Sequence, residues 1–258
     1  MGNSPLVSYT KISPHRVSPR NHEIDTVSIH CVVGQCAVES LGNAFSSVRK
    51  ASSNYGVGWD GRIGMYVEEG DRSICTSSKA NDNRAITIEV ASDNKHPYKV
   101  TAAAYEGLIR LLVDICQRNP GIKRLKWEGD KSLIGKVDRQ NMTVHRWFAN
   151  KACPGDYLYN RHGEIAAEVN RRLDALDEKE DDFMADPKKF EEAWLEYRKT
   201  LQDNDANAYS QLAREWAVNT GLMAGGSTGE FNGMWQDFLT REQFVTVLHR
   251  FAEIMGKA

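Results

Sequence analysis

The segment Asn141–Tyr157, with the sequence NMTVHRWFANKACPGDY, constrains the fold of this chain more than any other stretch. It places His145, Lys151 and Cys153 close together, and histidine and cysteine are both common metal ligands. The run TVSIHCVV holds another histidine, His30, far earlier in the chain. Two histidines and one cysteine leave a tetrahedral zinc ion one open position for water. The residues therefore predict a catalytic zinc site, provided that the fold brings these distant segments together.

Glu89 and Lys151 are the candidates for the accompanying acid–base and charge chemistry. In AITIEVA, the alternation of a strand puts Ile86 and Ile88 on one face and Glu89 on the other. A carboxylate within an apolar strand is either paired or functional, so Glu89 is the candidate acid–base group. Lys151 lies two residues before Cys153, where its ammonium is the candidate stabiliser of a developing oxyanion.

Ordinary structural roles compete with each of these assignments. Taken alone, His145 would be a structural histidine, Cys153 a buried thiol and Glu89 a capping or ion-pairing residue. The odd and scattered cysteines, Cys31, Cys36, Cys75, Cys116 and Cys153, indicate reduced thiols rather than a disulfide framework. We expect the remaining histidines to be solvated, with His162 as the substitute ligand: His15, His22, His96, His162 and His249.

Composition limits the classes of partner. The 258 residues carry a formal net charge of −2, which gives no electrostatic argument for nucleic acid or an anionic membrane as a partner. No apolar run approaches the length of a membrane span, and the first residues lack the apolar core of a secretory signal. We therefore expect a protein made in the cytoplasm without a signal peptide.

The alternation of strands and helices predicts an α/β domain with a mainly central sheet, followed by a small helical unit. We expect the domain over residues 1–176, a charged linker with a short helix over 177–205, and the helical unit over 206–258. The predicted strands are 26–33, 85–91, Lys123–Glu128 and Met142–His145, with a hairpin over Tyr55–Val67 turning at Asp60-Gly61. The predicted helices of the domain are Ala37–Lys50, Thr101–Asn119 and Arg161–Leu176.

Several segments together resemble the type 2 family of N-acetylmuramoyl-L-alanine amidases, which includes phage endolysins and is related to peptidoglycan recognition proteins. They are VSIHCVVGQ, SSNYGVGWDGRIGMYVEEGDRS, CTSSKANDNRAITIEVA and MTVHRWFANKACPGDYL, in order through most of residues 10–175. The resemblance implies a central mixed β-sheet flanked by helices, with one zinc ion per chain at the bottom of an open groove. It also implies hydrolysis of the amide between the lactyl group of N-acetylmuramic acid and L-alanine of bacterial peptidoglycan. The alternative is a non-catalytic peptidoglycan-binding protein on the same fold.

Carried over by position, the resemblance implies that His30, His145 and Cys153 are the zinc ligands and that Glu89 and Lys151 are catalytic. Some family members place a tyrosine before the Asp-Gly hairpin, and Ser53 occupies that position here. Glu89 and Lys151 would then carry more of the proton handling. The candidate groove residues for substrate are Asn54, Trp59 and Thr76, although Trp59 could equally be an aromatic that packs on the hairpin.

The C-terminal stretch LAREWAVNTGLMAGGSTGEFNGMWQDFLTREQFVTVLHRFA resembles one S-layer homology repeat. Modules of this kind hold proteins on bacterial cell walls. The resemblance implies a secondary cell-wall polymer as a further partner, with packing or dimerisation of the unit as the rival role. Together these features predict a phage or prophage endolysin that reaches the wall after release from the cytoplasm.

Overall fold

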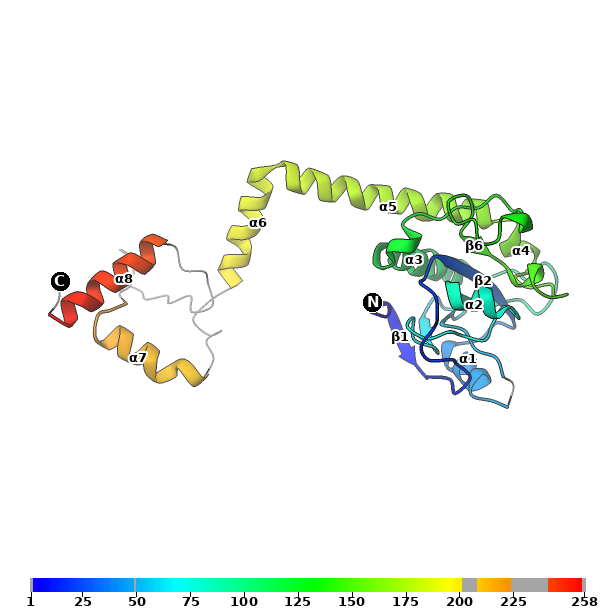
Figure 1. Cartoon of the computed structure of the whole chain (residues 1–258), viewed down its shortest axis with the longest axis horizontal. Helices are drawn as coiled ribbons and strands as arrows, with labels where there is room; N and C mark the ends of the chain where they lie inside the picture. Colours follow the sequence, from blue (N-terminus) through cyan, green and yellow to red (C-terminus); the bar gives the residue numbers. More distant parts are fainter. Residues whose placement is uncertain (1, 49, 201–207, 224–240, 257–258) are drawn as a thin grey trace. The chain divides into compact units, whose positions relative to one another are not determined.

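The computed structural model describes residues 2–48, 50–200, 208–223 and 241–256, which form two compact units, Met1–Glu178 and Lys179–Ala258 (Figure 1). The first unit contains a six-stranded sheet in the order β1-β4-β3-β5-β2-β6. Every neighbouring pair is parallel except β3 and β4, so the sheet is mixed, as predicted. The strands are β1 (Val7–Thr10), β2 (Thr26–Val33), β3 (Tyr55–Val57), β4 (Ile63–Met65), β5 (Ala85–Ser92) and β6 (Met142–Thr143). The α-helices of this unit are α1 (Val38–Phe45), α2 (Lys79–Arg84), α3 (Ala102–Arg118), α4 (Gly155–Tyr159) and α5 (His162–Ala185).

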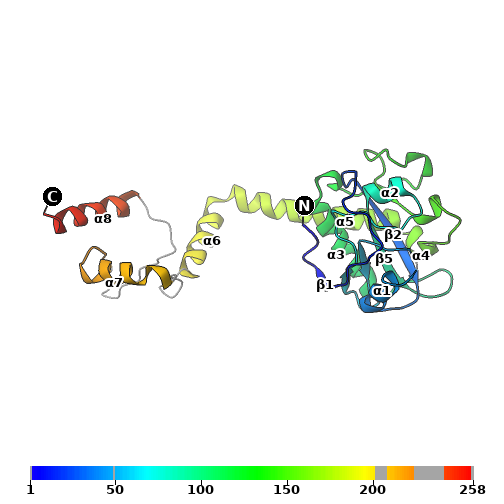
Figure 2. The same ribbon diagram turned by 60° about the horizontal axis from the view of Figure 1, so that its bottom comes forward.

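The two faces of the sheet have different roles. Alternate residues of β2 and β5, such as Ile29 and Ile88, are fully buried against apolar residues of α3 and α5 in one continuous core. Helices α3 and α5 lie side by side in both views (Figure 2), and an Arg172–Glu106 ion pair links them. The residues between, including His30 and Glu89, point to the other face. The alternation predicted for AITIEVA is therefore confirmed, and it separates the apolar core from the polar candidates.

Helix α3 shows how the sequence sets an element that supports the sheet. The hydroxyl of Thr101 accepts a hydrogen bond from the Ala104 N–H at 3.0 Å, which caps the helix as predicted. Leucine and isoleucine at helical spacing then form its buried stripe: Leu108, Leu111, Leu112 and Ile115. The helix ends at Arg118, one residue before its predicted end.

Helix α5 extends past the predicted end at Leu176 to Ala185. The residues that follow Leu176 are charged but contain no glycine or proline before Pro187, so nothing in the sequence stops the helix. Pro187 then begins α6 (Pro187–Thr200), a position at which the missing N–H of proline has no cost. The segment predicted as a linker is thus largely helical where the structure describes it.

The predicted strand Lys123–Glu128 is wrong, because residues 125–130 form no regular element. Side-chain amides take the place of a neighbouring strand. The Leu125 N–H donates to Asn170 Oδ1 at 2.9 Å, and the Lys126 N–H donates to Asn141 Oδ1 at 2.8 Å. The backbone N–H groups of an extended segment can bond either to a neighbouring strand or to side-chain amides, and the sequence periodicity is the same in both cases.

Short elements account for most other differences from the predictions. Helix α1 ends at Phe45 rather than at the predicted Lys50, since Ser46 bonds back to the Gly42 carbonyl through its hydroxyl at 2.8 Å. Strand β6 covers only Met142–Thr143, and the chain then turns into the 3-10 helix His145–Trp147. Elements as short as β1, α2 and α4 carry too few periods to be predicted.

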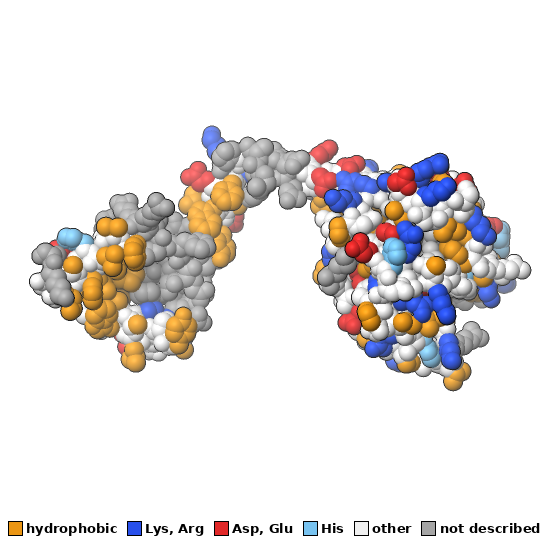
Figure 3. Space-filling view, viewed as in Figure 1, with side chains coloured by type: hydrophobic (Ala, Val, Ile, Leu, Met, Phe, Trp, Pro, Cys, Tyr) orange, Lys and Arg blue, Asp and Glu red, His pale blue; other side chains and the backbone are white. Residues whose placement is uncertain are grey.

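The second unit is helical in its described residues, as predicted, with α6, the 3-10 turn Ala208–Ser210, α7 (Gln211–Asn219) and α8 (Arg241–Ile254). Helix α7 is followed by Gly221 in the left-handed conformation, at φ 71°. The predicted glycine-rich loop and the predicted cap Thr240 lie outside the described residues. Hydrophobic side chains gather on the visible surface of this unit (Figure 3). The exposed hydrophobic residues of its described helices include Leu212, Trp216, Val245, Leu248 and Phe251. Among the described helices, none is long and apolar enough to cross a membrane.

The hairpin turn between β3 and β4 gives a direct test of the packing. Gly61 has φ 80°, and a Cβ there would lie 2.5 Å from the Ala103 carbonyl oxygen at the start of α3. We expect Gly61→Ala to lower the free energy of unfolding by about 2 kcal/mol, since it adds both strain and a backbone clash. Urea unfolding followed by circular dichroism measures this. Gly70→Ala is the control, because its Cβ would meet nothing within 4 Å. Equal effects of the two substitutions would contradict the proposed close approach.

Candidate metal centre

Strand register places His30 between Glu89 and His145. On one side, His30 of β2 is directly paired with Glu89 of β5. On the other, Ser28 is paired with Thr143, the last residue of β6, and the chain then turns into the 3-10 helix that begins at His145, beside His30. Neighbouring strands are about 4.8 Å apart, and the rings of His30 and His145 have centroids separated by 5.3 Å. The sheet thus brings together two of the candidate ligands and the candidate acid–base group.

Cys153 reaches the same place through a loop that closes beyond the end of β6. The Cys31 N–H, on the edge of β2 that β6 no longer covers, donates to Cys153 Sγ at 3.4 Å. The Arg146 N–H donates to the Cys153 carbonyl at 3.1 Å and closes the loop. Cys153 Sγ consequently lies 3.3 Å from His30 Nδ1, and the donor atoms of His30, His145 and Cys153 are all within 4.8 Å of one another.

This donor set fits zinc. A tetrahedral zinc ion holds a sulfur and a nitrogen ligand about 3.6 Å apart, close to the observed distance between Cys153 and His30. His30 is completely buried, and its Nδ1 is the ring nitrogen that faces Cys153 and Glu89. Burial, with smaller effects of His145 and His162, lowers the pKa of His30 to about 3. The imidazole is therefore neutral at physiological pH, as metal ligation requires.

His145 is oriented by a residue that was not predicted. Ser77 Oγ lies 3.0 Å from His145 Nε2, within hydrogen-bond distance, which leaves the other ring nitrogen for a metal. Ser77 has φ 66°, an unusual conformation for a residue with a side chain. Burial, followed by the charge of Lys151, lowers the pKa of His145. Only the loop conformation identifies Ser77, and the sequence carries no signal for it.

Glu89 lies beside the ligands rather than among them. Its Oε1 is 3.9 Å from His30 Nδ1, and its Oε2 is buried without a hydrogen-bond partner among the described residues. The side chain is 17% exposed, and its removal from water, more than any neighbouring charge, raises its pKa to about 8. A carboxyl group that holds a proton near neutral pH has the acidity of a general acid–base catalyst.

Lys151 is exposed on the same loop, between His145 and Cys153. Its charge reaches the centre, since it contributes to the lowered pKa of His145. Within the described part of the chain, the Lys151 ammonium makes no hydrogen bond to the donor atoms of His30, His145 or Cys153. The side chain can therefore turn towards a bound substrate.

Two of the three predicted groove residues are structural. Asn54 is fully buried, and its amide bonds the backbone carbonyls of Val67 and Glu68 and the N–H of Thr87. Thr76 is fully buried too, with its hydroxyl 2.6 Å from Asp82 Oδ1. These contacts correct the expectation for Asn54 and Thr76, because neither side chain has a polar atom left for substrate.

Trp59 differs from them, because its side chain is 50% exposed at the hairpin turn. Its backbone is fixed on both sides. The Trp59 N–H donates to the Cys36 carbonyl at 3.0 Å, and its own carbonyl accepts from the Thr101 hydroxyl. An anchored but exposed indole remains available to a ligand, and the proposal of a groove role for Trp59 stands.

The structure places no tyrosine from the β3 segment at the centre. Ser53, at the position where some relatives carry tyrosine, is fully buried, and its hydroxyl donates to the Tyr55 carbonyl at 2.6 Å. The Tyr55 ring lies in the core on the opposite face, where its hydroxyl donates to Glu69 Oε1 at 2.6 Å. The candidate for proton transfer beside His30 is therefore Glu89 and not Tyr55.

His162 is the exception among the histidines predicted to be solvated. It is fully buried, its Nδ1 lies 2.8 Å from the Leu158 carbonyl, and its ring lies 4.4 Å from that of Trp127. Trp127 in turn stacks on Trp147 at 5.0 Å. This aromatic cluster supports the loop that carries His145. The remaining four histidines are partly or fully exposed.

Arg146, also not predicted, ties the two ends of the ligand loop together. Its guanidinium donates to the Ala152 carbonyl at 2.6 Å and to Asp156 Oδ1 at 3.0 Å, and it lies 4.4 Å above the Tyr159 ring. Because Arg146 follows one ligand and Ala152 precedes the other, this side chain fixes the spacing between His145 and Cys153.

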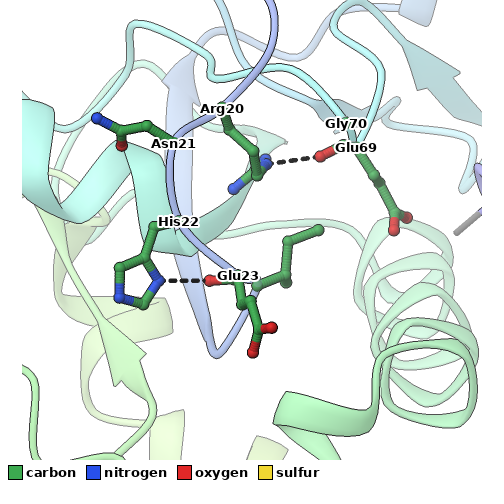
Figure 4. Close-up of a pocket in the computed structure, with 7 residues that line it drawn as sticks. Arg20, Asn21, His22, Glu23, Glu69 and Gly70 are labelled. Atoms are coloured by element: carbon green, nitrogen blue, oxygen red, sulfur yellow. Dashed lines mark hydrogen bonds between the residues drawn. The ribbon is translucent and has the colours of Figure 1, made fainter.

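A separate hollow lies near the start of β2 and contains none of the candidate ligands (Figure 4). It is lined by Arg20, His22, Glu23 and Glu69 among others. The Arg20 guanidinium donates to four backbone carbonyls, those of Glu69, Asp71, Asn83 and Ala85. Arg20 therefore holds loops together, with four of its five N–H groups bonded to backbone carbonyls.

Comparison with known proteins agrees with this geometry. Residues 20–156, more than half of the chain, match the family model described as N-acetylmuramoyl-L-alanine amidase. The chain therefore belongs to the N-acetylmuramoyl-L-alanine amidase family, as predicted. The match does not extend to the second unit, and no curated protein sequence matches the chain significantly.

Solved structures with a similar arrangement have low sequence identity to the chain. A selenomethionine AmpD derivative is 18% identical, with 61% of this chain and 93% of that chain covered and a TM-score of 0.45. The amidase LysC from Clostridium intestinale is 17% identical, with 64% and 95% covered and a TM-score of 0.39. The Drosophila peptidoglycan recognition protein SA is 19% identical, with 57% and 82% covered and a TM-score of 0.44.

The Ser77 contact predicts a loss of metal affinity without loss of a ligand. We expect Ser77→Ala to weaken zinc binding roughly 10- to 100-fold, because it frees the ring of His145 to rotate. Competition with a chromophoric chelator measures the affinity. Ser40→Ala, at an exposed position of α1, should leave the affinity unchanged. An unchanged affinity in Ser77→Ala would show that the hydroxyl does not orient the ligand.

The raised pKa of Glu89 predicts how the stability of the metal-free protein changes with pH. Its folded pKa of about 8 exceeds the ordinary pKa of a glutamate, 4.5, so the folded state retains a proton that the unfolded state loses. Between these values, wild type should lose stability relative to Glu89→Gln by up to roughly 1.4 kcal/mol per pH unit. Urea unfolding in the presence of chelator at about pH 5 and about pH 8 measures this. A difference independent of pH would contradict the raised pKa.

Proposed function

We propose that this chain is a zinc-dependent N-acetylmuramoyl-L-alanine amidase that cleaves the bond between the lactyl group of N-acetylmuramic acid and L-alanine. The observation that carries the proposal is the convergence of His30, His145 and Cys153 within 4.8 Å, with Glu89 beside His30. Membership of the amidase family supplies the substrate class. One zinc ion per chain accounts for the three converging donors.

The ligands and Glu89 would divide the chemistry as follows. The chemistry that zinc supplies in a site with three protein ligands is activation of water near neutral pH and polarisation of a carbonyl. The Glu89 carboxylate accepts a proton from the attacking water and delivers it to the nitrogen of L-alanine as the amide bond breaks. A group with a pKa raised by burial is suited to both transfers, because it can hold and release a proton near neutral pH.

Lys151 and Trp59 would act on the substrate rather than on the metal. Lys151 stabilises the negative charge that develops on the carbonyl oxygen, since its ammonium is exposed on the ligand loop. Trp59 offers an exposed apolar surface at the neighbouring hairpin turn, where a sugar ring or peptide can pack. Both roles require peptidoglycan to bind beside the ligands.

Two rivals use the same residues differently. A non-catalytic peptidoglycan-binding protein would not require all three metal-binding residues, and Cys153 is present here together with His30 and His145. A cysteine hydrolase would require Cys153 as a thiolate, paired with His145. In the metal-free protein, the contact with Cys31 and burial raise the pKa of Cys153 well above its usual value, and its nearest ring nitrogen is Nδ1 of His30. The structure therefore favours a metal ligand over a nucleophile.

The biological setting of the proposal is lysis of a bacterial wall by a phage or prophage endolysin made in the cytoplasm. Its support is the resemblance of the catalytic segments to that group. The second unit would bind a secondary cell-wall polymer or a second copy of the chain. Exposed apolar residues on its helices, such as Trp216 and Phe251, offer surface for either role.

Digestion of purified peptidoglycan, followed by mass analysis of the products, tests the function. Wild type should release intact stem peptides with a free L-alanine amino group, and a chelator should abolish the release. Cleavage within the glycan or within the stem peptide would contradict the assignment. Activity that survives the chelator but is lost on thiol alkylation would favour the cysteine hydrolase. Zinc binding and peptidoglycan binding without any product would favour the binding protein.

Glu89 has its own test. We expect Glu89→Ala to lower turnover at least roughly 100-fold, the scale of a lost general base, while zinc content stays near one per chain. Metal analysis and product release are measured on the same preparation. Glu191→Ala, at an exposed position of α6, is the control. Retained turnover in Glu89→Ala would remove Glu89 from the mechanism.

A further inference from the structure

A second donor set overlaps the first one. Cys75 precedes α2, and its Sγ lies 3.9 Å from Glu89 Oε1. The same oxygen lies 3.9 Å from His30 Nδ1, and the donor atoms of His30, Cys75 and Glu89 are all within 4.8 Å of one another. A zinc ion holds a thiolate sulfur and a carboxylate oxygen about 3.6 Å apart, so little movement would let Cys75 and Glu89 share an ion.

The backbone around Cys75 is held in place independently of any metal. The carboxylate of Asp82, on α2, accepts hydrogen bonds from the N–H groups of Cys75 at 3.1 Å and Thr76 at 3.0 Å. Glu89 is fixed by the central strand β5, and its Oε2 has no partner among the described residues. Two donors on fixed supports, one of them with an unsatisfied oxygen, form a prepared site rather than a chance contact.

The two donor sets share only His30, and this determines which set binds a metal ion first. An ion bound by His30, His145 and Cys153 has three protein ligands, whereas the neighbouring position then retains only Cys75 and Glu89. Water would complete the coordination of a second ion. The second position should consequently bind more weakly than the first and fill only when the metal is in excess.

We propose that Cys75 and Glu89 form a second, weaker site for a thiophilic divalent cation such as zinc, and that filling it inhibits the enzyme. Binding displaces the protons of the thiol and the carboxyl group to solvent and leaves both groups coordinated. A carboxylate that shares its charge with a cation is a weaker base, so Glu89 accepts a proton from water less readily. The inhibition rests on the proposed role of Glu89 as the base, whereas the second site itself does not.

Equilibrium dialysis of the full chain against zinc, with metal analysis, tests the site separately from activity. Wild type should bind one ion tightly and a second one more weakly. Cys75→Ser should keep the first ion and lose the second, and Cys75→Ala provides the same test should serine retain partial ligation. Cys36→Ser is the matched control, because Cys36 is also partly buried near Glu89 but belongs to neither donor set.

Activity and alkylation complete the test. Excess zinc should lower the turnover of wild type and Cys36→Ser roughly 100-fold, but should leave Cys75→Ser near its rate at one equivalent. Cys75 should become protected from alkylation only when the second equivalent of zinc is added, and mass mapping of the alkylated protein measures this. A second ion that persists in both Cys75 variants, or protection of Cys75 by the first equivalent, would overturn the proposal. Absence of turnover at one equivalent would instead contradict the proposed function.

Discussion

The alignment of β2 with its two neighbours is the constraint on which the metal centre depends. One register pairs His30 with Glu89, and the other carries His145 to the opposite side of His30. Because side chains alternate along a strand, a slip of one residue would turn His30 into the apolar core and bring Ile29 to the site. The buried contacts of Ile29 and Ile88 with α3 and α5 oppose that slip, so the core also determines the position of the ligands.

A buried donor set of this kind is poorly satisfied without a metal. Among the described residues, Glu89 Oε2 is buried without a hydrogen-bond partner, although most buried polar atoms in proteins have one, and His30 Nδ1 lies against Cys153 Sγ. Burial keeps His30 neutral and Glu89 protonated, which lowers the cost of removing them from water. A bound cation would compensate the thiolate and attract the carboxylate. Features that disfavour stability are concentrated where the chemistry is expected.

The sequence was sufficient for the parts that depend on residue type and alternation. The strands over 26–33 and 85–91, helix α3 and the hairpin at Asp60-Gly61 follow from local patterns, and the family resemblance linked His30 to the distant ligand loop. Loop geometry was not accessible in the same way. Asn54 and Thr76 have the polarity of ligand-binding residues, but they bond the protein itself, whereas Ser77 and Cys75 approach the centre only because their loop folds back.

X-ray absorption at the zinc edge of the protein loaded with one equivalent tests the central claim most directly. The account predicts a first shell with one sulfur at about 2.3 Å and two imidazole nitrogens at about 2.0–2.1 Å, completed by one light atom from water. The sulfur contribution should disappear in Cys153→Ser and persist in Cys75→Ser. A shell of oxygen ligands alone, or a sulfur that is lost only in Cys75→Ser, would contradict the assignment of His30, His145 and Cys153 as the zinc site.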